Sequence, residues 1–252
     1  MNFNRIATAL WLPATLLIGW EAASRLRFID PLFFPAPTLL VAMGWKMFLS
    51  GELPEHLQAT LSRLFAGYAA GCAAGIVLGV LMGASTRIRR SLELIVSAGY
   101  STPKVTLLPM LMLLFGVGSL PGVLVVTAAC LIQMTIHTMD GVRGVNRRYV
   151  EMASNYGADR MMVIRDIYLP SSLPQVFTGL RIALGVGLIL TISVELVSSQ
   201  KGLGGLLWIS WQTFAIEKVY IGVGVSAILG AIFHRALRIA ERSAIPWRQT
   251  NS

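Results

Sequence analysis

Long apolar segments alternate with shorter polar segments along most of the chain. A helix needs roughly 20 consecutive apolar residues to cross the hydrocarbon core of a bilayer. The pattern therefore predicts an all-α, polytopic membrane protein, built as one domain over residues 1–252. The third and fourth apolar segments are so close together that they should form a tight hairpin. Six spans are expected, near residues 6–24, 64–84, 94–117, 120–139, 174–199 and 219–240.

The composition agrees with burial in lipid. Hydrophobic residues make up 55% of the 252 positions, and charged residues make up only 13%. Soluble domains carry about 25% charged residues, so this chain has more apolar surface than a soluble fold needs. A large soluble core is the alternative, and apolar runs of helix-spanning length argue against it. Membrane lipid is therefore an expected partner.

The formal net charge is +9, and the positions of the arginines indicate its meaning. Many arginines stand in short clusters just outside apolar segments, such as Arg87, Arg89 and Arg90. The positive-inside rule produces this pattern, because cytoplasmic loops collect arginine and lysine. With both termini in the cytoplasm, about twice as many of these residues lie inside as outside. The charge thus predicts an orientation in the membrane and not a nucleic-acid partner.

Glycine recurs at every fourth residue of the second predicted span. Residues four apart lie on one face of a helix, and small residues there let another helix approach closely. Two interpretations stay open, namely packing against a helix of the same chain, or a face that moves or forms a dimer. The glycines are Gly67, Gly71, Gly75, Gly79 and Gly83.

The polar segment 140–172 is too long and too regular to be a simple connection. Asn146 can cap a helix over residues 147–156, because its side-chain oxygen can accept from a first-turn amide. Four residues of this helix repeat at i, i+3, i+4 and i+7 and form an apolar stripe. They are Tyr149, Met152, Ala153 and Tyr156.

A second helix is expected after Gly157, which breaks or bends the first. Asp159 can cap this second helix. It is expected to end near Leu169, because Pro170 stops it. The segment therefore predicts two short amphipathic helices at the membrane surface.

The same segment resembles the E-A-A, G, I-x-L-P loop of binding-protein-dependent ABC importer permeases. Met152 stands where that family usually has its central alanine. The whole chain looks most like the nitrate, aliphatic sulfonate and taurine branch. The residues that carry the resemblance are Glu151-Met152-Ala153, Gly157 and Ile167-Tyr168-Leu169-Pro170, with Phe34-Pro35-Ala36-Pro37 and Gly202-Leu203-Gly204 elsewhere.

The resemblance implies a type I ABC importer permease in the bacterial cytoplasmic (inner) membrane. Two permease copies, expected to be identical, would bind a dimer of ATPase subunits inside and a substrate-binding protein outside. The first loop helix would dock on the ATPase through Tyr149, Glu151, Met152, Ala153, Tyr156 and Gly157, supported by Ile167, Leu169 and Pro170. The alternative is that the stripe covers the permease's own helix ends.

Among the ionisable residues within predicted spans are two that need a reason, because burial of a charge in the membrane is expensive. Lys104 lies in the third span beside Ser101 and Thr102, and Glu195 lies in the outer half of the fifth. They can pair with each other or with carbonyls freed by nearby prolines. Alternatively, together with Gln133, they line the path of a small anionic solute such as a sulfonate, taurine or nitrate.

Other classes of protein fit less well. A membrane enzyme is disfavoured because the chain has no paired intramembrane carboxylates and no H-E-x-x-H motif. None of its four lysines follows a glycine, so ATP must be hydrolysed by another subunit. A secondary transporter would show repeated, broken halves, which are not apparent. Cys72 and Cys130 lie in apolar segments and are expected to pack, without a metal, disulfide or cofactor. A cationic or neutral cargo, such as a thiamine precursor, stays open.

Overall fold

The computed structural model describes residues 3–198 and 201–246, and the side chains of residues 3–10 and Arg160 lie outside that description. The described residues form helices joined by short connections, with no strand among them. Two short irregular helices are the 3₁₀ segment η1 (Lys104–Leu107) and the π segment η2 (Ile164–Tyr168). The α-helices are α1 (Phe3–Arg25), α2 (Pro37–Leu49), α3 (Glu52–Ala84), α4 (Thr86–Ser101), α5 (Leu108–Phe115), α6 (Ser119–Arg143), α7 (Arg147–Asn155), α8 (Arg160–Val163), α9 (Leu169–Ser198), α10 (Leu203–Gln212) and α11 (Ile216–Ala244).

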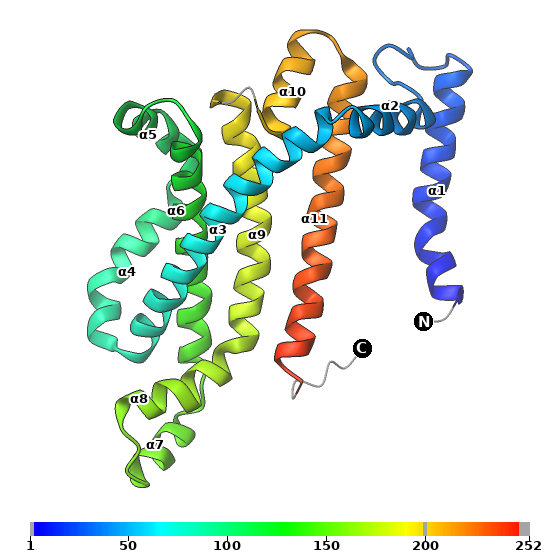
Figure 1. Ribbon diagram of the computed structural model, residues 1–252. Helices are drawn as coiled ribbons and strands as arrows, with labels where there is room; N and C mark the ends of the chain where they lie inside the picture. Colours follow the sequence, from blue (N-terminus) through cyan, green and yellow to red (C-terminus); the bar gives the residue numbers. More distant parts are fainter. Residues whose placement is uncertain (1–2, 199–200, 247–252) are drawn as a thin grey trace.

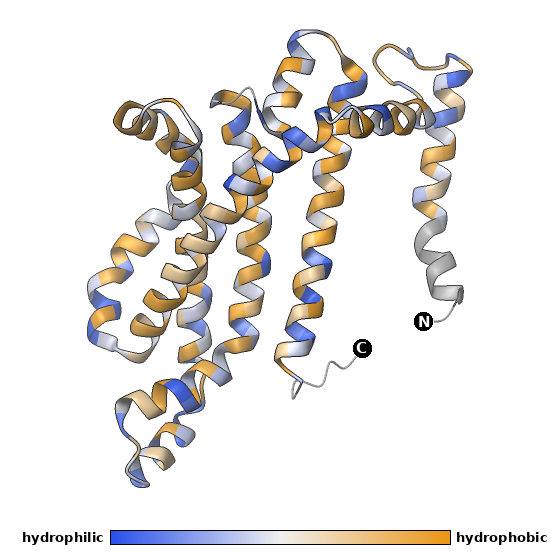
Figure 2. Ribbon diagram, viewed as in Figure 1, coloured by the Kyte–Doolittle hydropathy of each residue, from blue (hydrophilic) through white to orange (hydrophobic). Residues whose placement is uncertain are grey.

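Four helices of the described residues are long and apolar enough to cross a membrane. They are α3, α6, the continuous helix Met161–Ser198 that includes α9, and α11. Figure 1 shows them side by side, and Figure 2 shows apolar residues along their middle parts. The predicted all-α membrane architecture is confirmed, whereas the number of six spans is not. Ser199, the predicted end of the fifth span, lies outside the described residues.

The third predicted span, residues 94–117, is not one continuous helix. α4 ends where Thr102 becomes extended (φ −73°, ψ 128°). Pro103 follows, which has no N–H to donate and disfavours a helical conformation in the residue before it. The chain continues through η1 into α5, which ends at Gly116 (φ 78°). Only residues 116–118 separate α5 from α6.

The glycine face of α3 lies directly against α6. A Cβ on Gly71 would lie 2.8 Å from the Cβ of Cys130, and one on Gly75 would lie 2.6 Å from the Cβ of Met134. Side chains do not approach so closely, so a larger residue would push the two helices apart. Gly67, Gly79 and Gly83 meet α6 in the same way, and the whole row therefore packs within one chain.

The main core lies between α3, α6 and α9 and includes Leu64, Met134 and Leu188. Cys72 and Cys130 are buried in it as free thiols. The cysteines thus contribute apolar packing at the place where three of the long helices meet.

The two ends of the bundle carry different elements (Figure 1). α7 and α8 lie at one end, called the loop end below, and the first and last described residues also lie toward it. α2, α5 and α10 lie at the opposite end, called the α10 end, where Leu53, Leu203 and Ile221 form a second core. α1 stands beside this bundle and packs through α2 and through Trp20, whose ring centroid lies 5.5 Å from that of Tyr220 on α11.

Candidate functional site

The loop between α6 and α9 forms the helix and turn that its sequence predicts. Asn146 precedes α7, and its Oδ1 accepts a hydrogen bond from the Arg148 amide at 3.0 Å, as expected for a cap. The helix ends in a Schellman motif, in which the Ala158 amide donates to the Ala153 carbonyl at 3.0 Å. Gly157 has φ +80°, and a Cβ there would meet open space. Its backbone conformation, and not crowding, therefore favours glycine.

The apolar stripe of α7 is exposed to solvent. Tyr149 is 57% exposed, Met152 55% and Tyr156 88%. With Ile167 of η2 they line an open hollow of about 390 Å³ between α7 and the start of α9. Glu151 points to the other side of α7, where its carboxylate pairs with Arg147 at 3.0 Å. The stripe is thus apolar surface at the loop end that no other part of the described chain covers.

The second loop helix begins as expected, because Asp159 Oδ1 accepts from the Met162 amide at 2.7 Å. Its predicted end at Leu169 was wrong, since the helix runs on through α9 without a stop at Pro170. In η2 the hydrogen bonds reach one residue further back, and the Leu169 amide donates to the Ile164 carbonyl. In a regular α-helix the ring of Pro170 would clash with the carbonyl four residues back, and a π turn just before it changes that spacing so that the helix can continue.

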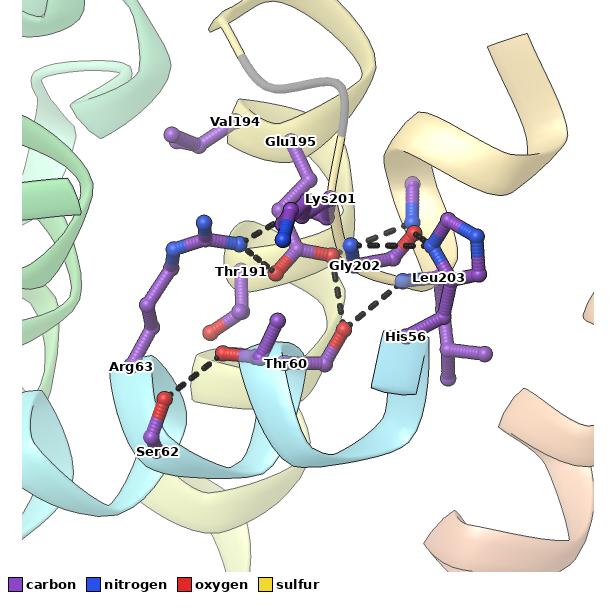
Figure 3. Close-up of polar contacts among 12 residues, drawn as sticks. His56, Thr60, Ser62, Arg63, Thr191, Val194, Glu195, Lys201, Gly202 and Leu203 are labelled. Carbon is purple, nitrogen blue, oxygen red and sulfur yellow. Dashed lines mark hydrogen bonds and ion pairs between the residues drawn. The ribbon is translucent and has the colours of Figure 1, made fainter. Parts of the chain in front are cut away.

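Glu195 is buried at the α10 end with 1% of its surface exposed. Figure 3 shows Arg63 of α3 facing its carboxylate, with Arg63 Nη1 2.7 Å from Glu195 Oε1. Glu195 Oε2 accepts two further bonds, from the Thr60 hydroxyl at 2.8 Å and from the Gly204 amide at 3.1 Å. The buried charge is therefore paired and hydrogen-bonded, as burial requires.

The turn before α10 is built on this carboxylate. Gly202 has φ +114°, and a Cβ there would fall on the Glu195 carboxylate. The Gly202 amide donates to His56 Nδ1 at 3.1 Å, and the Leu203 amide donates to Thr60 Oγ1 at 2.8 Å. Figure 3 shows these contacts joining α3, α9 and the start of α10 in one network.

Lys104 is not a partner of Glu195. Its Nζ donates to the Tyr100 carbonyl at 2.7 Å and lies 5.7 Å from the centre of the Tyr100 ring. Ser101 and Thr102, which are exposed, donate their hydroxyls to carbonyls one turn back in α4. Gln133 is half-buried on α6. The helix break at Pro103 therefore gathers a cation and hydroxyls on one side of the bundle.

Residues 75–245 match the family described as binding-protein-dependent transport system inner membrane component. The chain belongs to this family. The taurine transport system permease protein TauC of Escherichia coli is 32% identical over 239 residues, which cover 93% of this chain and 87% of TauC. SsuC of Escherichia coli, named for aliphatic sulfonate transport, is 30% identical and covers 96% of this chain and 92% of SsuC. The riboflavin transport system permease protein RibX of Chloroflexus aurantiacus is 32% identical, covering 95% of this chain and 90% of RibX.

Solved ABC transporters share the fold of this permease. An inward-facing form of the MetNI methionine transporter matches 74% of the permease and 93% of its own chain, with a TM-score of 0.66 and 20% identity. A bacterial alginate transporter, in complex with an alginate pentasaccharide-bound periplasmic protein, matches 100% of the permease and 99% of its own chain, with a TM-score of 0.61 and 15% identity. The permease is thus a multi-pass inner-membrane protein with the type I importer fold.

Sequence reasoning missed the partners of Glu195 in this permease. Hydropathy placed the second span from residue 64 and left Arg63 outside it, whereas α3 begins at Glu52. An acidic residue within a span demands a cation, and that demand was the one signal for Arg63. This signal does not distinguish Arg63 from Lys104. Both lie far from Glu195 in the sequence, and the sequence alone does not show which of them lies near it in the fold.

Proposed function

We propose that this permease carries a small anionic solute of the sulfonate, taurine or nitrate type into the cytoplasm, driven by a separate ATPase. The permease itself is the non-catalytic subunit. The observation that carries the proposal is the exposed apolar stripe of α7, set in a loop with the spacing of the importer family. The likeness to permeases named for taurine and sulfonates supports the cargo.

The proposed ATPase contact is α7. Tyr149, Met152 and Tyr156 expose apolar surface to water, which a partner with an apolar groove would cover. Ala153 stands on the same face, and Glu151 stands on the rim, where its pair with Arg147 is solvent-exposed. Gly157 sets the reversal, so that a force on α7 reaches η2 and α9 through a defined turn.

The remaining loop residues support this contact. Ile167 forms part of the hollow behind the stripe, and Leu169 and Pro170 open α9. A displacement of α7 would therefore pass into a helix that continues through the bundle to Ser198. This continuity gives a direct mechanical connection between ATPase and membrane helices.

The loop end is proposed to face the cytoplasm, with both chain termini on the same side. The arginine distribution and the position of both described chain ends at the loop end support this orientation. The α10 end would then face the substrate-binding protein. A second, identical permease copy completes the assembly, and two ATPase subunits complete it on the cytoplasmic side.

The proposed path passes the helix break at Pro103. Lys104 offers a positive charge there, beside Ser101 and Thr102, and Gln133 adds a polar group on α6. Glu195 is left out of the lining, since its charge is compensated by Arg63. Uptake of a labelled sulfonate by a Lys104→Met variant is expected to fall at least tenfold, and uptake at the normal rate would remove Lys104 from the path.

A neutral or cationic cargo is the second candidate, because RibX, at 32% identity, is a riboflavin permease by name. Calorimetry of ligand binding to the partner substrate-binding protein distinguishes an anionic cargo from a neutral or cationic one. Binding of taurine or alkanesulfonates supports the anionic cargo, whereas binding of riboflavin or a pyrimidine alone would replace it. Uptake that persists after ATP depletion would instead indicate a secondary transporter.

A further inference from the structure

A hollow of about 290 Å³ lies at the loop end, where α3 and α6 end and α4 and α7 begin. Three arginines from three helices line it, namely Arg89 of α4, Arg143 of α6 and Arg147 of α7. Tyr168 of η2 completes the wall, and no acidic residue contributes to the lining. Nothing in the proposed transport cycle uses this hollow.

The positive charges of the arginines in the hollow are not fully neutralised by nearby carboxylates. Within residues 3–198 and 201–246, the side chains of Arg89 and Arg143 form no ion pair or hydrogen bond. Arg147 pairs with Glu151 on its own helix, but both side chains are solvent-exposed and such pairs are weak. Arg89 is half-buried, whereas Arg143 and Arg147 are exposed, as is Arg87 on the helix of Arg89. A half-buried guanidinium without an anion favours binding one.

The hollow lies where two of the membrane-crossing helices, α3 and α6, end. Its walls include Gly83, near the last residue of α3, and Val142, near the last residue of α6. Apolar parts of both helices lead away from it into the bundle, and Figure 2 shows hydrophilic residues in the first turns of α4, beside the end of α3. Basic pockets between membrane helices at this level are suited to phosphate-bearing headgroups.

We propose that this hollow binds a phosphate-bearing anion, held by Arg89 and Arg143 with Arg147, and that in the membrane the phosphate belongs to an anionic phospholipid. Guanidinium groups offer paired N–H donors that match phosphate oxygens. A hollow of about 290 Å³ has room for a phosphate group.

Binding would link the start of α7 to the bundle. Arg89 and Arg143 extend from α4 and α6, whereas Arg147 is the first residue of α7. An anion that contacts all three holds α7 against the helix ends. This consequence for coupling rests on the proposed function of α7, but the binding site itself does not.

The test uses the purified full-length permease in a neutral detergent and needs no partner subunit. Its thermal midpoint is measured with added phosphatidylglycerol, with phosphatidylcholine and with inorganic phosphate. The site variant is Arg89→Gln with Arg143→Gln. The matched control is Arg87→Gln with Arg90→Gln, which removes the same charge from exposed neighbours in α4. We expect phosphatidylglycerol to raise the midpoint by roughly 2–4 °C in the wild type and control, and not in the site variant.

Three results would overturn the proposal. Equal loss of the shift in both variant pairs would mean that general surface charge attracts the lipid. A shift produced by inorganic phosphate alone, with the same dependence on Arg89 and Arg143, would assign the hollow to a soluble anion instead of a lipid. Absence of any shift in the wild type would show that the hollow does not bind a phosphate-bearing lipid.

Discussion

Arg63 and Glu195 form a buried ion pair between α3 and α9, with Nη1 and Oε1 2.7 Å apart across 132 positions of sequence. Arg63 also donates to the Lys201 carbonyl at 2.8 Å, so one guanidinium holds both α9 and the turn that follows it. The pair therefore fixes how α10 sits on the bundle.

Replacing Arg63 with methionine should destabilise the permease, because Glu195 would keep its burial and lose its counter-charge. Breaking a buried pair from one side costs about 3–5 kcal/mol. The Arg63 side chain is 15% exposed, so the lower end of that range is expected. The thermal midpoint in detergent measures the effect.

Glu55→Gln is the matched control for that variant. It breaks the nearby pair of Glu55 with Lys201, in which both side chains are exposed (59% and 69%). An exposed pair in water contributes little to stability, so the midpoint should stay at the wild-type value. Equal midpoints for Arg63→Met and the wild type would show that the buried pair does not hold the α10 end together.

The glycine row of α3 gives a second prediction. Gly75→Ala would place a methyl group 2.6 Å from the Leu131 carbonyl oxygen and from the Met134 Cβ, and α3 and α6 must separate to admit it. Overpacking of this kind costs about 1–3 kcal/mol. Gly185→Ala in α9 meets nothing within 4 Å and should be neutral or slightly stabilising. Unfolding of both variants in denaturant compares the two, and equal stability would refute the close contact.

The loop hinge gives a third prediction. Gly157→Val should leave the permease assembled in the membrane but abolish ATP-driven uptake, because a β-branched residue is strained at φ +80°. Gly157→Asn should retain most uptake, since asparagine tolerates this conformation. Transport assays on both variants, at matched membrane levels, decide the point. Unimpaired uptake by Gly157→Val would remove the hinge from the mechanism.

Local patterns predicted the parts of the structure that depend on local chemistry. Asn146 and Asp159 cap their helices as their side chains allow, and Gly157 has the positive φ that its place after α7 demands. The spacing of the family loop lies within about 20 residues, so a single sequence carries all of it. α7 and its exposed stripe could therefore be predicted before the fold was known.

Two prolines show where local rules fail. Pro103 ends α4, but Pro170 does not end the helix that contains it. The difference comes from η2, where a π turn shifts the hydrogen bonds by one residue before the proline. The position of such a turn depends on packing around α9, which no short sequence pattern contains.

The central claim is that the stripe of α7 docks on an ATPase, and copurification with a tagged ATPase subunit tests it most directly. Met152→Asp puts a charge in the middle of the stripe, whereas Ser154→Asp puts the same charge on the opposite, exposed face of α7. Copurification is predicted to fall at least tenfold for Met152→Asp and to stay near the wild-type level for Ser154→Asp. Undiminished copurification of Met152→Asp, with the permease intact in the membrane, would contradict the account.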